Sequence, residues 1–97
     1  MTLRFRPEAE DEYLHAVSWY EEQREGLGHE FIQAVESTLD FIEENPEMYP
    51  VIRGELRRAL LRRFPFALLY RVREQDIIVA GVVHLRRNPT NWSRREG

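Results

Sequence analysis

The amino-acid sequence predicts an α+β domain in which a helical hairpin packs on one face of an antiparallel sheet, with the elements in the order β-αα-βββ. Two observations support this fold class. Apolar residues recur at helical spacing through most of the first half of the chain, and the second half changes to the period of strands. Helices and strands that are segregated in this way form a layered α+β fold, and 97 residues correspond to one domain, residues 1–97.

The first half begins with a short strand and continues as two helices. Residues 2–6 alternate apolar and polar side chains, which predicts a half-buried strand at an edge of the sheet. Pro7 suits the first turn of a helix, and apolar residues then form one stripe over residues 9–20. A second stripe covers residues 31–42 and stops at an asparagine–proline pair. The Gly26-Leu27-Gly28 turn between the stripes predicts an antiparallel helical hairpin.

The second half predicts strands separated by short turns. These strands cover residues 51–53, 56–62, 66–73 and 77–85. A turn at residues 74–76 joins the last two. The last strand is apolar on both of its faces, which indicates an interior strand that the helical hairpin covers on one side.

The composition argues against several classes of protein. The chain has no cysteine, so it has neither a disulfide framework nor a thiolate metal site. His15 and His29 lie on different predicted helices without a partner four residues away, which offers no histidine metal site. No signal-peptide pattern and no run of ~20 apolar residues is present. We therefore expect a cytoplasmic protein that needs no cofactor.

The charge of the chain is strongly asymmetric. Residues 1–50 hold 13 acidic residues against 3 arginines, whereas residues 51–97 hold 11 arginines against 4 acidic residues. Paired arginines border the apolar strands at Arg57-Arg58, Arg62-Arg63 and Arg86-Arg87. Guanidinium groups bind carboxylates and phosphates in a bidentate manner, so this half of the chain is expected to meet an anionic partner. Charges on an outer strand also protect a sheet from edge-to-edge aggregation, and the sequence leaves both explanations open.

Several motifs in one order resemble a known superfamily. They are the helical hairpin with Gly26-Leu27-Gly28 and Phe31, the Asn45-Pro46 break, the segment from Arg62 to Phe66 that leads to Leu69-Tyr70, and His84 followed by Arg86-Arg87 and Pro89. Together they resemble the RelE/ParE superfamily of toxins from bacterial type II toxin–antitoxin modules. The resemblance covers nearly the whole chain and implies a cognate antitoxin that neutralises the toxin.

This superfamily contains two activities. RelE-like members cut messenger RNA on the ribosome, and ParE-like members, the plasmid stabilisation branch, are described as poisons of DNA gyrase. An arginine typically stands three residues before the strand tyrosine in RelE-like chains, but this chain has Ala67 there, as ParE-like chains have an apolar residue. Trp92 lies where RelE-like enzymes often have tyrosine, and an indole cannot exchange a proton as a phenol can. The resemblance therefore favours a ParE-like growth inhibitor that acts on gyrase.

Two alternatives to the gyrase poison remain open. Arg86 matches the RelE-like arginine after the last strand, so the chain would be a ribosome-dependent messenger RNA endoribonuclease if Arg58, His84 and Arg86 supplied charge and proton transfer. For His84 we favour the simpler explanation, an ordinary hydrogen bond at the end of a strand. The other alternative is an inert module that only binds the antitoxin. The sequence thus leaves open whether the protein is an enzyme.

The residues predicted to bind a partner are mostly arginines and tryptophans. They are Trp19, Arg57, Arg58, Arg62, Arg63, Arg86, Arg87 and Trp92. The antitoxin is expected as an extended or helical segment along the sheet edge and the hairpin groove. Trp19 lies off the main stripe of its helix, where it would be a natural contact for a partner chain. For Trp92 we favour a role as a hydrophobic lid over the end of the sheet. Tyr70 alternates with apolar strand residues, which predicts a core aromatic whose hydroxyl finds a partner.

Overall fold

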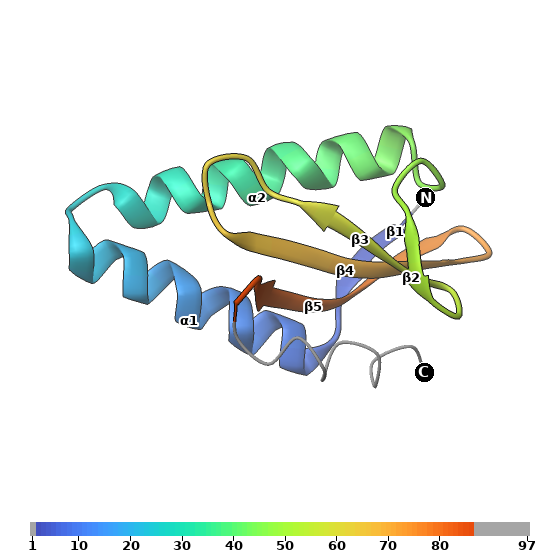
Figure 1. Ribbon diagram of the computed structural model, residues 1–97, viewed down its shortest axis with the longest axis horizontal. Coiled ribbons are helices and arrows are strands. Elements are labelled where there is room, and N and C mark those ends of the chain that lie inside the picture. Colours follow the sequence, from blue (N-terminus) through green and yellow to red (C-terminus); the bar gives the residue numbers. More distant parts are fainter. Residues whose placement is uncertain (1, 87–97) are drawn as a thin grey trace.

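A computed structural model describes residues 2–86 of the chain and confirms the α+β fold class (Figure 1). Its helices and strands follow one another as β1 (Thr2–Phe5), α1 (Pro7–Gln23), α2 (Leu27–Glu44), β2 (Val51–Arg53), β3 (Leu56–Leu60), β4 (Phe66–Arg73) and β5 (Asp76–His84). Figure 1 shows α1 and α2 running in opposite directions from the turn that joins them. The predicted helical hairpin is therefore present, with both helices close to their expected bounds.

The five strands form one sheet in the order β1-β5-β4-β3-β2. Strands β2 to β5 pair with their neighbours in antiparallel fashion, as the sequence predicts. Strand β1 lies at an edge, also as predicted, but it pairs with β5 in parallel, with Leu3 opposite Ile77. After β1 the helical hairpin carries the chain to the opposite edge of the sheet, where β2 lies. No tight turn therefore joins β1 to β5, and only neighbours joined by a tight turn must be antiparallel.

The core lies between the helical hairpin and one face of the sheet. Four aromatic rings form its centre, and Phe31 of α2 lies 5.1 to 5.2 Å from the rings of Tyr20, Phe64 and Phe66. Aromatic pairs at this spacing contribute about 0.5–1.5 kcal/mol each beyond their burial. The Tyr70 ring also faces the hairpin, and its hydroxyl donates a hydrogen bond to the Pro46 carbonyl at 2.8 Å. The predicted role of Tyr70 as a buried aromatic with a partner is confirmed.

The helical hairpin depends on two glycines at its turn. Gly26 has φ +89°, a left-handed conformation that glycine adopts without strain. Gly28 packs so closely on α1 that an added Cβ would lie 2.9 Å from the carbonyl oxygen of Val17. The Glu21 carboxylate accepts hydrogen bonds from the backbone N–H groups of Gly26 and Gly28, at 3.0 and 2.9 Å. These two bonds stabilise the ionised carboxylate and lower the pKa of Glu21.

Strand bounds differ from the predicted ones where the backbone turns. Strand β3 ends at Leu60 because the chain then enters a turn in which Arg63 has φ +72°. Strand β5 begins at Asp76, one residue earlier than predicted, because Asp76 pairs with Arg73 across the turn.

A bulge between β4 and β5 changes which residues face the helices. Leu69 lies opposite Gly81 and Tyr70 opposite Val79, so Ala80 is an extra residue in β5. Before the bulge, Val79 faces the hairpin; after it, Val82 does.

Neither α1 nor α2 is long and apolar enough to cross a bilayer.

Candidate partner-binding groove

An open groove of about 640 Å³ runs between α2 and the outer side of β3. Its apolar lining is unusual because three large side chains remain exposed there: Phe41 on α2 (44 %), Met48 (57 %) and Leu60 at the end of β3 (52 %). Exposed apolar side chains that gather in one concave site are typical of surfaces that bind a partner.

The groove exists because β2 covers only part of β3. Strand β2 has three residues, and it pairs with β3 only at Leu56 and Arg57. Within residues 2–86, no strand pairs with the outer side of Ala59 and Leu60. An uncovered strand edge of this kind can accept a strand from another chain.

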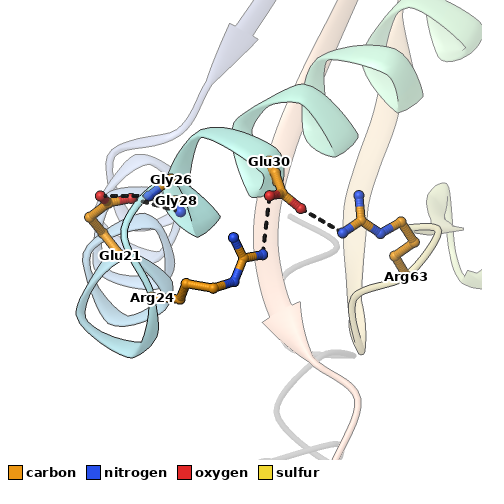
Figure 2. Close-up of polar contacts among 6 residues, drawn as sticks. All are labelled: Glu21, Arg24, Gly26, Gly28, Glu30 and Arg63. Atoms are coloured by element: carbon orange, nitrogen blue, oxygen red, sulfur yellow. Dashed lines mark hydrogen bonds and ion pairs between the residues drawn. The ribbon is translucent and has the colours of Figure 1, made fainter.

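Arginines at one end of the groove differ in their partners. The Arg63 guanidinium donates a hydrogen bond to Glu30 Oε1 at 2.6 Å, and Arg24 donates to Glu30 Oε2 at 3.1 Å (Figure 2). These two arginines hold the pKa of Glu30 below its ordinary value, Arg63 contributing most. Arg62 is exposed and makes no hydrogen bond or ion pair within residues 2–86. The groove therefore offers one arginine that an added carboxylate could bind without displacing Glu30.

Arg57 holds the loop after α2. Its guanidinium donates hydrogen bonds to the carbonyls of Glu47 and Tyr49, at 2.9 and 2.7 Å. Tyr70 lies opposite Arg57 in the sheet and anchors the same loop through Pro46. Burial raises the pKa of Tyr70 to about 12, so its hydroxyl stays protonated and donates at neutral pH. Both side chains fix the segment that carries Met48 into the groove.

The residues predicted for nuclease chemistry are not brought together as one set. Arg58 lies opposite Leu69, on the sheet face away from the hairpin. His84 lies opposite Phe66 on the hairpin side, and the two rings are 5.1 Å apart. The bulge at Ala80 is the physical reason, because it reverses the alternation of β5 before His84. The exposed Arg86 is close to His84, since its backbone N–H donates to His84 Nδ1 at 3.1 Å.

Comparison with known proteins assigns the chain to a family. A family model described as the ParE toxin of the type II toxin–antitoxin system parDE matches residues 3–89. The chain belongs to the ParE toxin family. It is the toxin component of a type II toxin–antitoxin system, and its cognate partner is an antitoxin.

A solved structure has a similar fold. It is described as the chromosomal ParDE TA system from P. aeruginosa and superimposes with a TM-score of 0.66. The match covers 89 % of this chain and 97 % of that chain, at 16 % sequence identity. No match was found among curated protein sequences.

Of the predicted binding residues within residues 2–86 of this ParE-family toxin, Arg62 and Arg63 line the groove, whereas Trp19, Arg57, Arg58 and Arg86 do not. Trp19 is exposed (46 %) on α1 and packs edge-on against Tyr20 at 5.1 Å. Arg87 and Trp92 lie outside the described residues. Their roles, like those of the other predicted site residues, stay predictions.

Sequence reasoning missed the apolar part of the groove. Phe41, Met48 and Leu60 belong to no predicted site, yet one signal was available. Phe41 stands outside the apolar stripe of its helix, directly before the buried Ile42. An apolar residue outside the stripe of an amphipathic helix is a candidate contact for a partner.

Proposed function

We propose that this ParE-family toxin inhibits growth by poisoning DNA gyrase, and that its antitoxin neutralises it by occupying the groove between α2 and β3. The observation that supports a poison over a nuclease is the environment of Ala67. This residue is fully buried on the sheet face away from the hairpin, opposite Val83. A nuclease needs a fixed cation at the scissile phosphate, and a methyl group cannot supply one. Activity on gyrase would place the protein in the cytoplasm.

The groove suits a particular kind of antitoxin segment. Phe41, Met48 and Leu60 offer an apolar surface, and Arg62 offers a cation at one end. The uncovered edge of β3 adds backbone groups that can pair with an extended chain. We therefore expect an amphipathic segment whose apolar side chains pack on the groove and whose carboxylate binds Arg62.

One observation favours a second candidate, the messenger RNA endoribonuclease. Arg86 and His84 are neighbours, and the hydrogen bond from the Arg86 N–H to His84 Nδ1 leaves Nε2 to carry the proton of the neutral ring. A histidine can transfer protons, and an exposed arginine beside it can bind a phosphate of the RNA. Arg58, the third residue predicted for nuclease chemistry, lies on the other face of the sheet from His84. Its position argues against this candidate.

One experiment separates the candidates. The toxin is induced in bacterial cells with and without its antitoxin, and growth, DNA damage signalling and primer-extension maps of ribosome-bound messenger RNA are recorded. Purified toxin is then added to gyrase in a supercoiling assay. We expect growth arrest that the antitoxin reverses, inhibited supercoiling and no new cuts in the RNA. Toxin-dependent cuts inside codons would establish the nuclease, and normal growth at confirmed expression would leave only an inert antitoxin-binding module.

A further inference from the structure

Sulfur in this chain occurs only in methionine. The chain has no cysteine, and its two methionines are Met1 and Met48. Met48 lies in the loop after α2, lines the groove and is 57 % exposed. Phe41 and Leu60 are the other large exposed apolar residues of the groove. A thioether that dissolved oxidants can reach is therefore part of the apolar surface that we assign to the antitoxin.

Hydrogen bonds hold the backbone on both sides of Met48. The Arg57 guanidinium donates to the carbonyls of Glu47 and Tyr49, the two residues that flank Met48 in the sequence. The N–H of Met48 donates to the carbonyl of Asn45 at 3.1 Å. Moving Met48 out of the groove would break these bonds. An atom added to its thioether therefore has to be accommodated inside the groove.

Hydrogen peroxide converts a methionine thioether to a sulfoxide. The O–O bond of the peroxide breaks and an S–O bond forms, sulfur loses two electrons, and the second oxygen leaves as water with both hydrogens. The product is polar where the thioether was apolar. Water solvates the new oxygen in the free toxin, where Met48 is exposed. Under an apolar side chain of a partner the oxygen would lose that water, and burial of an unpaired polar group is unfavourable.

We infer that Met48 is an oxidation-sensitive site whose sulfoxide weakens antitoxin binding, so that peroxide leaves the toxin active. This inference rests on the proposed position of the antitoxin in the groove between α2 and β3. Oxidation acts on free toxin, because a bound antitoxin covers the thioether. Methionine sulfoxide reductases reverse the reaction, which makes the effect temporary.

The test compares the native toxin with Met48→Leu, a matched control that keeps the apolar surface and the other methionine but cannot form a sulfoxide at this position. Each full-length toxin is treated with hydrogen peroxide, and catalase removes the excess before antitoxin is added. Mass spectrometry locates the added oxygen, thermal melting checks the fold, and isothermal titration calorimetry measures the affinity.

We expect the oxidised native toxin to bind the antitoxin about 10- to 100-fold more weakly than the untreated toxin, the range that follows from burial of an unpaired polar group. Peroxide should leave the affinity of Met48→Leu unchanged. Methionine sulfoxide reductase should restore the affinity of the oxidised native toxin. In the toxin–antitoxin complex, Met48 should be oxidised more slowly than in the free toxin.

Unchanged affinity after complete oxidation of Met48 would overturn the inference, and so would an equal loss in peroxide-treated Met48→Leu, which would assign the effect to another residue. Leu60→Asp separates this failure from failure of the docking site. If Leu60→Asp weakens binding and oxidation of Met48 does not, the groove binds the antitoxin and only the oxidation effect is absent. If neither change alters the affinity, the antitoxin does not occupy the groove and both proposals fail.

Discussion

The carboxylate of Glu30 lies 2.6 Å from the guanidinium of Arg63 and thereby distinguishes two neighbouring arginines of the groove. Arg63 donates this hydrogen bond to Glu30 of α2, whereas the side chain of Arg62 has no such partner within residues 2–86. The two residues are adjacent in sequence and equal in charge. A partner's carboxylate must compete with Glu30 at Arg63 but not at Arg62. Their contributions to antitoxin binding should therefore differ.

Arg62→Ala is expected to weaken antitoxin binding about tenfold, because the variant loses an ion pair with the partner. Arg63→Ala should change the affinity by less than about threefold, since its main contact lies within the toxin. Isothermal titration calorimetry with the purified antitoxin measures both. Equal losses in the two variants would mean that the partner displaces Glu30, and an unchanged affinity in Arg62→Ala would contradict the proposed docking site.

Leu60→Asp should reduce antitoxin affinity by about 10- to 100-fold, because a leucine that becomes buried contributes about 1.5–3 kcal/mol and a charge in its place must be desolvated. Leu60 is already exposed in the free toxin, so the fold should tolerate the change. Leu14→Asp is the matched control, since Leu14 is exposed to a similar extent (57 %) on α1. Comparable losses in both variants would place the antitoxin outside the groove or across both helices.

Gly28→Ala should destabilise the toxin by about 1–3 kcal/mol, the usual cost of forcing an extra methyl group into a close contact. The added Cβ would lie 2.9 Å from the backbone oxygen of Val17, which cannot move without shifting α1. Urea unfolding measures the change. Asp40→Ala on the exposed side of the same helix should stay within about 0.5 kcal/mol of the native protein. A Gly28→Ala variant of native stability would show that the two helices separate at little cost.

The sequence predicted the elements of this fold better than their arrangement. Helical and strand periods are local, so the hairpin and the strands were found close to their true bounds. The pairing of β1 with β5 joins residues that are more than 70 positions apart, and no local pattern encodes that contact. The bulge at Ala80 is equally hidden, because the apolar run of β5 looks the same with or without an extra residue.

The same holds for the candidate site: local features could be predicted from the sequence, and contacts between distant segments could not. Arg62 was predicted from its charge alone, and the structure places it in the groove. Arg57 was predicted as a partner contact, but its hydrogen bonds to Glu47 and Tyr49 depend on how the loop after α2 folds back. Strict alternation along β5 would have put His84 on the same face as Arg58. The bulge separates them, so that the nuclease hypothesis looked stronger in the sequence than it does in the structure.

Glu21 should make the stability of the toxin depend on pH in the acidic range. Hydrogen bonds from Gly26 and Gly28 lower its pKa below the ordinary 4.5, so the folded state binds its proton less readily than the unfolded state. The stabilisation is complete above the unfolded pKa and is lost as the pH falls through the folded pKa. Glu21→Gln should therefore be less stable than the native protein at neutral pH, with a difference that shrinks below pH 4.5.

Urea unfolding across this pH range tests the prediction, and Glu22→Gln controls for the loss of one negative charge at the next exposed position of α1. Glu30 carries a shift in the same direction, so the native curve contains both carboxylates and only the difference between variants isolates Glu21. If Glu21→Gln has a free energy of unfolding that is lower than that of the native protein by the same amount at neutral and acidic pH, the loss comes from packing or hydrogen bonding of the amide and not from the missing charge. The ionised carboxylate would then not be what holds the helical hairpin at its turn.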